Sequence, residues 1–446
     1  MNKKVFKSYD IRGIYPDDLT EDVAYLVGQA FPHLTKSKKV VVGRDMRIGS
    51  PELSQKLIEG LVSQGIDVED IGLVSIDALY FSVGKFEYDG GIMVTASHNP
   101  KEYNGFKMVY KIPDGIEWIR GVELYEFIEK NTFADKPKKG VVTERDLMPE
   151  FIDHLMSFID IHKIKPFTIV VDAGNGMAGK VMPELFKKLP CKLIPLNFEL
   201  DGNFPAHPSN PLLPESQAEI KKRVVAEKAD FGIILDGDTD RLFFVTEKGE
   251  FVSADTTLLI LAKYFIAHNP NAGIAYNVIC SKAVRERVKE WGGRPLRSKV
   301  GFVFLARAMK KEKGIMSGEL SAHYAFRDNY YADSGFIAFL ILLMLISEDD
   351  KPLSKIIEGI NPYAKAPEVN IKVKDIQAII QKVKEKFSDG EQDELDGITV
   401  EYKDWWFNVR PSNTEPLLRI TVEGDTEEIL KEKQQEVVEF IKQHAD

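Results

Sequence analysis

The chain alternates short apolar runs with amphipathic stretches over most of its length, and this alternation limits the fold more than any other feature. The strand-like runs are 39–43, 91–95, 168–172, 192–196, 231–236 and 273–279. The helix-like stretches are 51–64, 178–189, 214–228, 254–268, 281–291 and 300–311. This order predicts α/β layers with partly parallel, mixed sheets. Because many of the runs are apolar throughout, we expect helices on both faces of the sheets.

Changes in composition suggest where one structural unit ends and the next begins. A length of 446 residues is enough for about three domains at about 150 residues each. Polar or proline-containing segments lie near residues 131–140, 248–250 and 360–367. The segment after them changes pattern, with a helix at 374–387, strands near 398–402, 405–410 and 417–423, and a helix from Thr426. We therefore predict three similar α/β domains at 1–140, 141–248 and 249–364, followed by a smaller α+β domain at 365–446.

Charge and composition exclude several classes of protein. The chain has 59 basic and 69 acidic residues, a net charge of −10, so it is not attracted as a whole to nucleic acid or to an anionic membrane. The longest apolar run, 336–346, is shorter than the roughly 20 residues that cross a bilayer, and it predicts a buried helix. Residues 1–10 lack the apolar core of a signal peptide. We therefore expect a soluble cytoplasmic protein with no nucleic-acid or membrane partner.

Cysteine usage is too sparse for a disulfide framework or a four-thiolate zinc site. The chain contains two cysteines, Cys191 and Cys280. Cys280 follows an apolar strand-like run and Cys191 follows Leu189 and Pro190. We expect both to be buried thiols.

The first candidate site is a serine where an apolar strand gives way to a loop. The run 91–95 leads into Ser97, His98, Asn99 and Pro100, and Lys107 follows ten positions after Ser97. Reactive side chains gather at strand ends in α/β sheets, and a proline removes an amide donor and stiffens the exit. A serine hydroxyl is a weak nucleophile until a neighbouring group activates it. The alternative is a turn-forming Ser–His–Asn cluster without chemistry.

The second candidate site is an acidic loop. A buried strand at 231–235 opens into Asp236, Asp238 and Asp240, with Arg241 next to them. If the loop is extended, side chains at alternate positions point the same way, and three adjacent carboxylates repel one another. A divalent cation relieves this repulsion, and Mg²⁺ prefers such oxygen ligands. Arg241 could hold an anionic ligand beside the metal.

Two other structures compete for the same loop. A calcium EF-hand would place its acidic twelfth residue at Glu247, which fits. Its sixth position, however, needs glycine for a sharp turn, and here that position is Arg241. The flanking runs also predict strands rather than the helices of an EF-hand. A solvated acidic turn remains the plain alternative.

The third candidate site contains Glu319, Ser321 and His323 at alternate positions. On a strand or loop these side chains would share one face, where the carboxylate and the hydroxyl could bind two adjacent sugar hydroxyls. His323 could exchange a proton near neutral pH. The alternative is a polar turn that precedes the helix beginning near Ser334.

The fourth candidate site lies between two predicted strands of the C-terminal segment. Arg410, Ser412, Asn413 and Thr414 offer a guanidinium fork, hydroxyls, an amide and backbone N–H groups. This set of donors suits a dianionic phosphate. A hairpin loop rich in turn-forming residues is the alternative.

Together with the opening Tyr9–Asp10–Ile11–Arg12–Gly13, these motifs resemble those of the α-D-phosphohexomutase superfamily, in the phosphomannomutase/phosphoglucomutase group. The resemblance spans the whole chain, and the motifs follow the family order. It implies four domains around a central cleft, with a phosphoserine at Ser97 and Mg²⁺ held by Asp236, Asp238, Asp240 and a phosphoserine oxygen. Glu319 and Ser321 then bind the sugar, while Arg410, Ser412, Asn413 and Thr414 bind its phosphate. Tyr9, Arg12, His98, Lys107 and Arg241 fall on positions around the substrate and the reacting groups.

The resemblance also implies a reaction. Phosphorylated Ser97 gives its phosphoryl group to a hexose monophosphate, which produces a hexose 1,6-bisphosphate. This intermediate reorients and returns its other phosphoryl group to Ser97. The bisphosphate thus acts as both intermediate and activator, and Mg²⁺ is the cofactor. His323 is our candidate for the general base. Closure of the fourth domain over the cleft is a further expectation.

Two positions depart from the family pattern and affect the choice of sugar. Ile279 stands where members that use both mannose and glucose phosphates often have lysine, and Phe302 stands where they often have histidine. The Glu–Leu–Ser triplet at 319–321 lacks the glutamine typical of phosphoglucosamine mutases, which makes glucosamine phosphate the less favoured substrate. The alternatives to a mannose or glucose phosphate mutase are a weakly catalytic phosphosugar-binding protein, a phosphoglucosamine mutase and a metal-dependent sugar phosphatase. The sequence leaves open whether the protein is a monomer or a dimer.

Overall fold

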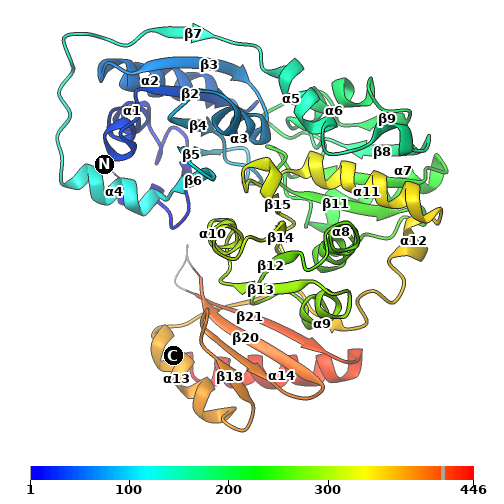
Figure 1. Ribbon diagram of the computed structural model, residues 1–446. Helices are drawn as coiled ribbons and strands as arrows, with labels where there is room; N and C mark the ends of the chain where they lie inside the picture. Colours follow the sequence, from blue (N-terminus) through cyan, green and yellow to red (C-terminus); the bar gives the residue numbers. More distant parts are fainter. Residues whose placement is uncertain (1, 413–416, 446) are drawn as a thin grey trace. The chain divides into compact units, whose positions relative to one another are not determined.

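The computed structural model describes residues 2–412 and 417–445, and the chain divides into two compact units. The first unit is Met1–Thr257 with Ser321–Ile356. The second unit is Leu258–Leu320 with Ile357–Asp446. The chain therefore leaves the first unit and later returns to it, as the colours of Figure 1 let the reader follow.

A mixed seven-stranded sheet forms the first part of the first unit, in the order β1-β5-β4-β2-β3-β7 with β6 paired to β5. Its strands are β1 (Ile11–Ile14), β2 (Lys39–Arg44), β3 (Asp67–Leu73), β4 (Gly90–Val94), β5 (Tyr103–Ile112), β6 (Gly115–Ile119) and β7 (Val142–Glu144). The strand β2 pairs in parallel with β3 and β4, whereas β5 runs antiparallel to its neighbours. The carboxyl ends of β2 and β4 thus meet at one edge, where the chain enters the loops that carry Arg47 and Ser97.

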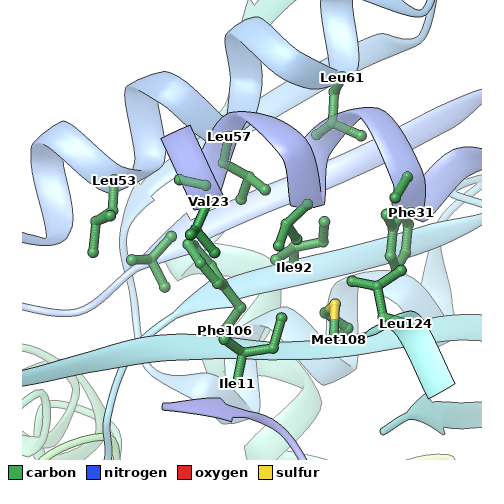
Figure 2. Close-up of a cluster of buried hydrophobic side chains, with 14 of the residues drawn as sticks. Ile11, Val23, Phe31, Leu53, Leu57, Leu61, Ile92, Phe106, Met108 and Leu124 are labelled. Carbon is green, nitrogen blue, oxygen red and sulfur yellow. The ribbon is translucent and has the colours of Figure 1, made fainter. Parts of the chain in front are cut away.

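Four helices pack on this sheet: α1 (Glu21–Thr35), α2 (Ser50–Ser63), α3 (Ile76–Lys85) and α4 (Gly121–Glu129). The hydroxyl of Thr20 caps α1 by accepting a hydrogen bond from the backbone N–H of Val23. The helices α1 and α2 cross closely because Gly28 has no side chain; an added Cβ there would lie 2.9 Å from the backbone nitrogen of Leu61. Figure 2 shows the resulting core, which includes Ile11, Val23, Phe31, Leu53, Leu57, Leu61, Ile92, Phe106, Met108 and Leu124.

A second mixed sheet completes the first unit, in the order β11-β10-β8-β9. Its strands are β8 (Thr168–Asp172), β9 (Lys192–Leu196), β10 (Phe231–Leu235) and β11 (Leu242–Thr246). The associated helices are α5 (Met148–Met156), α6 (Ala178–Phe186), α7 (Pro214–Ala226), α11 (Gly335–Asp349) and α12 (Leu353–Ile356), and the short strand β15 (Tyr324–Phe326) precedes α11. The ring of Phe339 in α11 lies 6.5 Å from that of Phe231 in β10, centroid to centroid. The predicted buried helix at 336–346 is confirmed, because every residue in that range is buried.

The second unit contains a parallel strand group and an antiparallel sheet. The strand β12 (Gly273–Asn277) pairs in parallel with β13 (Arg294–Ser298) and β14 (Met316–Gly318). The helices that accompany them are α8 (Ala254–His268), which begins in the first unit, α9 (Lys282–Glu290) and α10 (Phe302–Glu312). The antiparallel sheet has six strands, β16 (Ala364–Lys365), β17 (Val369–Lys372), β18 (Glu391–Asp393), β19 (Ile398–Glu401), β20 (Trp405–Pro411) and β21 (Leu417–Gly424), and is covered by α13 (Ile376–Lys386) and α14 (Glu427–Gln443).

The predicted fold class, α/β layers followed by a smaller α+β segment, is confirmed. The domain boundaries remain a prediction, and β7 extends the first sheet beyond residue 140.

The prediction for Cys191 was wrong: this thiol is half-buried, because it lies just before β9 at the edge of its sheet, whereas Cys280 is buried as expected. Within residues 2–412 and 417–445, no helix combines the length and apolar character needed to cross a bilayer.

Candidate active site

Ser97 lies in the turn that follows β4, with its backbone in the left-handed region at φ 51°. The side chain is 1% exposed, and the backbone N–H donates to Thr95 Oγ1 at 3.0 Å. The Ser97 hydroxyl donates a 2.6 Å hydrogen bond to Asp236 Oδ2, and His98 Nδ1 lies 3.3 Å from Ser97 Oγ. The strand-end serine thus faces the acidic loop that follows β10.

The acidic loop brings its three carboxylates together in a manner that the sequence did not predict. Oxygens of Asp236, Asp238 and Asp240 lie within 4.8 Å of one another, and all three residues are buried. The loop is a tight turn rather than an extended segment, since Thr239 has φ 81°. The N–H groups of Thr239 and Arg241 both donate to Asp236 Oδ1, at 3.1 and 3.2 Å. The turn therefore winds around Asp236, and the rule of alternating side chains does not apply to it.

The EF-hand alternative does not fit this geometry. Residues 242–246 form strand β11, which pairs antiparallel with β10, so the would-be calcium loop is interrupted by a β-hairpin. Glu247, which would be the twelfth ligand, instead accepts a hydrogen bond from the backbone N–H of Ser354 at 3.1 Å.

The charges of the aspartate cluster suit a divalent cation. Burial and the neighbouring carboxylates of Asp240 and Asp238 raise the pKa of Asp236 to about 8. Asp238 Oδ1 is buried and makes no hydrogen bond. Three clustered carboxylates with an unpartnered oxygen form the donor set that hard cations such as Mg²⁺ prefer. This buried acidic cluster could therefore hold a metal ion.

Lys107, on β5, supplies the nearest positive charge. Its Nζ donates to Asp238 Oδ2 at 2.8 Å and also contacts Asp240 Oδ2. Burial alone would lower the pKa of Lys107, but the two carboxylates outweigh it and raise the pKa well above its ordinary value. Burial would likewise raise the pKa of Asp240, but Lys107, His323 and Arg241 lower it well below its usual value. Lys107 is thus a permanent ammonium beside Asp238 and Asp240.

Arg12 and His98 complete the surroundings of Ser97. Arg12 Nη1 donates to the carbonyl oxygen of Ala96 at 2.6 Å and also contacts the Asn99 side chain, while Asp10 accepts from Arg12 Nε at 2.9 Å. Burial and the guanidinium groups of Arg241 and Arg12 lower the pKa of His98 well below its usual value. His98 is therefore a neutral imidazole at neutral pH.

His323 also reaches this cluster, from the segment that returns to the first unit. Its Nε2 lies 3.3 Å from Arg241 Nε and 3.3 Å from Asp240 Oδ1, while its Nδ1 lies 2.9 Å from Ser321 Oγ. A neutral Nε2 accepts from Arg241, whereas a protonated one donates to Asp240. Of the strand and the loop that were expected for 319–323, the structure has the loop, because Ser321 lies in a turn and Ala322 has φ 66°.

The remaining predicted residues belong to the second unit or to the beginning of the chain. Glu319 is buried, and its Oε2 accepts a hydrogen bond from Asn277 Nδ2 at 3.3 Å. Tyr9 is half-buried in the bend before β1. Asn413 and Thr414 lie outside the described residues, while the backbone N–H of Ser412 donates to the carbonyl oxygen of Leu417 at 2.8 Å.

Arg410 is part of a three-residue ion cluster on the C-terminal sheet. It lies on β20 directly opposite Arg419 on β21. Glu368 bridges the two, with Arg410 Nη2 at 2.6 Å and Arg419 Nη1 at 3.0 Å from its carboxylate oxygens. Arg410 is 5% exposed, and its Nε is buried without a hydrogen-bond partner. One carboxylate between two guanidinium groups leaves a net positive charge that suits an anion.

Sequence reasoning missed several buried polar residues around Ser97. Asp45 and Arg47 follow β2 directly, and both are almost completely buried. Asp77 accepts a 2.5 Å hydrogen bond from the hydroxyl of Thr239, and Asp333 lies within 4.8 Å of Asp240 and His323. A charged residue within or next to an apolar run could have indicated such a buried position, as it does for Asp77 among the apolar residues of α3.

Comparison with known proteins assigns the chain to a family. Four models for the successive domains of phosphoglucomutase/phosphomannomutase, three α/β/α domains and a C-terminal domain, match residues 3–135, 149–249, 253–363 and 368–440. The chain is 40% identical to a phosphomannomutase of Vibrio cholerae, over 98% of each chain, and 36% identical to a phosphomannomutase/phosphoglucomutase of Pseudomonas aeruginosa, over 96% of this chain and 93% of that one.

The structural comparison agrees with the sequence comparison. The crystal structure of a phosphoglucomutase/phosphomannomutase family protein from Burkholderia thailandensis matches with a TM-score of 0.90 and 32% identity, over 100% of this chain and 99% of that one. The match therefore covers the whole four-domain architecture, and not only the parts that carry Ser97 and its aspartates. The chain belongs to the phosphoglucomutase/phosphomannomutase family of phosphohexose mutases.

Proposed function

We propose that the chain interconverts hexose 1-phosphate and hexose 6-phosphate, with mannose or glucose as the sugar, through a phosphoserine at Ser97 and a hexose 1,6-bisphosphate intermediate. The observation that carries this proposal is the 2.6 Å contact between the Ser97 hydroxyl and Asp236, inside a cluster that also contains two further aspartates and the Lys107 ammonium. A serine that carries a phosphoryl group needs cationic surroundings. Here the Lys107 ammonium and a cation held by the three aspartates would provide them.

In the first half of the reaction, a sugar hydroxyl oxygen forms a bond to the phosphorus on Ser97 while the bond from phosphorus to Oγ breaks. The proton of the sugar hydroxyl goes to His323, our candidate base, whose Nε2 is 3.3 Å from the Asp240 carboxylate that would stabilise the imidazolium. Ser97 Oγ leaves with the electron pair, takes a proton from water, and can then donate a hydrogen bond to Asp236. The reoriented bisphosphate then returns its other phosphoryl group to Ser97, and the protons move in the opposite direction.

The chain's own cations hold the transferring group. Lys107, Arg12 and Arg241 lie around Ser97 and its aspartates and would neutralise the phosphoryl oxygens. Asp236, Asp238 and Asp240 would hold Mg²⁺, which when bound supplies further positive charge for in-line phosphoryl transfer. His98 remains neutral and lies 3.3 Å from Oγ, so it can donate or accept a hydrogen bond without adding charge.

The substrate handles would come from the other predicted residues. We propose that Glu319 and Ser321 bind sugar hydroxyls, that Tyr9 contacts the substrate, and that Arg410, Ser412, Asn413 and Thr414 bind the phosphate that is not being transferred. The unpartnered Nε of Arg410 supports the phosphate assignment. Ile279, which is 4% exposed, and Phe302 replace polar side chains that would otherwise contact the sugar, so selectivity rests on the remaining handles. We also propose four domains, at 1–140, 141–248, 249–364 and 365–446, and closure of the last domain over the substrate.

A single assay separates this function from its alternatives. The protein is incubated with Mg²⁺, a trace of glucose 1,6-bisphosphate, and either mannose, glucose or glucosamine 1-phosphate. Formation of mannose or glucose 6-phosphate supports the proposal, and the ratio of kcat/KM values identifies the preferred sugar. Release of free phosphate would indicate a phosphatase, turnover of only the glucosamine ester a phosphoglucosamine mutase, and binding without turnover a phosphosugar-binding protein.

A further inference from the structure

We propose that Arg47 is the positioning residue that fixes the Ser97 loop, and with it the reacting oxygen, against the acidic loop. This inference rests on the proposed role of Ser97 as the phosphoryl carrier. Arg47 is 1% exposed, although it lies in the irregular segment between β2 and α2, where side chains usually face solvent. A fully buried guanidinium in such a segment requires partners for its donors.

The partners of Arg47 are the backbone carbonyl oxygens of the Ser97 loop. Its Nη2 donates to the carbonyl oxygens of Ser97 and Asn99, both at 2.7 Å. Its Nη1 donates to those of Pro100 and Tyr103, at 2.8 and 3.0 Å. Residues 97–102 form no strand or helix, so the carbonyl groups of Ser97, Asn99 and Pro100 have no sheet partner to hold them, and Tyr103 is the first residue of β5. The loop is therefore folded around one guanidinium group.

The rest of the Arg47 side chain is held in the first unit from two sides. Asp45 Oδ2 lies 3.4 Å from Arg47 Nε, and Asp45 Oδ1 accepts from the backbone N–H of Arg47 at 3.0 Å. The face of the guanidinium packs on the ring of Phe204, 4.9 Å from its centroid. Phe204 belongs to the segment between β9 and α7, which comes from the second sheet. Arg47 thus joins the serine loop of the first sheet to the part of the unit that carries the aspartates.

The same region shows a second close approach between the two loops. Gly237, between Asp236 and Asp238, faces the carbonyl oxygen of Ser97, and an added Cβ would lie 2.8 Å from that oxygen. The hydroxyl of Ser209 donates to the same carbonyl oxygen at 3.1 Å. Ser97 O is therefore held by Arg47 on the serine side and by Ser209 on the aspartate side. A shift of this carbonyl would move Ser97 Oγ relative to Asp236.

Lysine cannot reproduce this arrangement. A guanidinium presents five N–H donors in a planar fork, so two nitrogens can serve four separate carbonyl groups. A lysine ammonium has one nitrogen with three donors and would leave carbonyl groups of the loop unsatisfied. The expected result of Arg47→Lys is a protein that folds but holds Ser97 less accurately. Errors of about 1 Å in a reacting group can reduce the rate about 100-fold.

The test compares Arg47→Lys with Arg145→Lys, a matched control. Arg145 also packs on a phenylalanine, with its Cζ 3.9 Å from the Phe86 ring centroid, and it pairs with Glu150 at 2.9 Å. None of the hydrogen bonds and ion pairs of Arg145 in the described part of the chain is with the Ser97 loop. We would measure thermal unfolding, kcat and KM for mannose and glucose 1-phosphates, the rate at which glucose 1,6-bisphosphate phosphorylates Ser97, and the ³¹P chemical shift of the phosphoserine.

For Arg47→Lys we expect a folded protein with kcat and the rate of Ser97 phosphorylation both reduced about 100-fold. KM should change by less than about threefold, because the sugar and phosphate handles lie elsewhere, and the ³¹P resonance should shift. Arg145→Lys should match the wild type in all four measurements. A folded Arg47→Lys protein with wild-type kcat, phosphorylation rate and ³¹P shift would overturn the proposal.

A second variant keeps the test decisive if Arg47→Lys does not fold. Phe204→Leu leaves all four carbonyl hydrogen bonds in place and removes only the aromatic platform, so we expect about a tenfold fall in kcat at unchanged KM. Wild-type kcat and ³¹P shift in that variant would overturn the proposal. A wild-type protein that is never phosphorylated at Ser97 would overturn the proposed function, and the role of Arg47 would fall with it; phosphorylated wild type with unaffected variants would overturn the role of Arg47 alone.

Discussion

The Ser97 hydroxyl donates a 2.6 Å hydrogen bond to Asp236, a residue 139 positions later in the chain. The reacting oxygen and the acidic cluster are therefore in direct contact. Replacing the hydroxyl proton by a phosphoryl group removes this donor and adds about two negative charges beside three carboxylates. Phosphorylation of Ser97 and binding of a cation at the aspartates should consequently strengthen each other.

The first prediction concerns Ser97 itself. Ser97→Ala removes the proposed phosphoryl carrier, and we expect kcat to fall by at least about 10³-fold while the protein stays folded. Mass spectrometry after incubation with glucose 1,6-bisphosphate should show a phosphopeptide containing Ser97 in the wild type and none in the variant. The exposed Ser157→Ala serves as the control and should keep full activity. An active Ser97→Ala protein would reject the phosphoserine mechanism.

The second prediction concerns the metal. Burial and repulsion from Asp240 and Asp238 raise the pKa of Asp236 to about 8. Adding Mg²⁺ to metal-free protein should raise the melting temperature, because the cation relieves that repulsion. At a concentration of 100 times Kd the gain in unfolding free energy should be about 2.7 kcal/mol. Asp238→Asn removes one of the charged ligands and should weaken Mg²⁺ binding in calorimetry, whereas Asp349→Asn, away from the cluster, should not. Equal Mg²⁺ affinity in wild type and Asp238→Asn would contradict the assigned ligands.

The third prediction concerns the carboxylate between Arg410 and Arg419. Glu368→Gln leaves two guanidinium groups opposite each other without their shared anion, one of them 5% exposed. We expect the unfolding free energy of the C-terminal part to fall by about 1–3 kcal/mol. KM for phosphosugars should rise, because Arg410 loses the group that orients it.

Urea unfolding and steady-state kinetics check this prediction. The control is Glu394→Gln, which removes an ion pair with Lys384 at a side chain that is 64% exposed, and it should change stability by less than about 1 kcal/mol. If Glu368→Gln behaved like this surface variant in both measurements, the bridge would have no role in holding Arg410.

The fourth prediction concerns pH. His207 Nε2 lies 3.2 Å from Asp172 Oδ2. Burial lowers the pKa of His207, but the hydrogen bond and the charge of Asp172 outweigh it and raise the pKa above 6.5. The folded protein therefore binds more protons here than the unfolded chain, so this contribution to stability is fully present below pH 6.5 and is lost as pH rises through the folded pKa.

Urea unfolding between pH 5.5 and 9 measures this effect as the difference between wild type and His207→Gln. The difference in unfolding free energy should be largest at the acid end and should decline with increasing pH. His162→Gln, at an exposed position, provides the control. A difference that grows toward alkaline pH would contradict the sign.

The sequence predicted the order of elements well, because apolar runs at strand spacing and amphipathic helices are local signals. It also singled out Ser97, Lys107 and the three aspartates, whose side chains the structure brings together. It failed where the backbone leaves regular geometry: Thr239 and Ala322 both have positive φ, and the alternation rule assumes extended chain. The role of Arg47 could not be predicted, because its partners are backbone carbonyl groups about 50 positions away. Every residue has a backbone carbonyl group, so the sequence does not indicate which ones Arg47 binds.

The first unit is discontinuous, since residues 258–320 belong to the second unit and the chain returns only at Ser321. The returning segment brings both His323 and the apolar helix α11, whose Phe339 packs on Phe231 and Phe186. During synthesis, the sheet that carries the aspartates is therefore complete long before the helix that covers it leaves the ribosome. The nascent chain must carry an uncovered apolar surface on that sheet while the intervening residues are made. The sheet that carries the acidic loop therefore reaches its final packing only after the segment that begins at Ser321 has been synthesised.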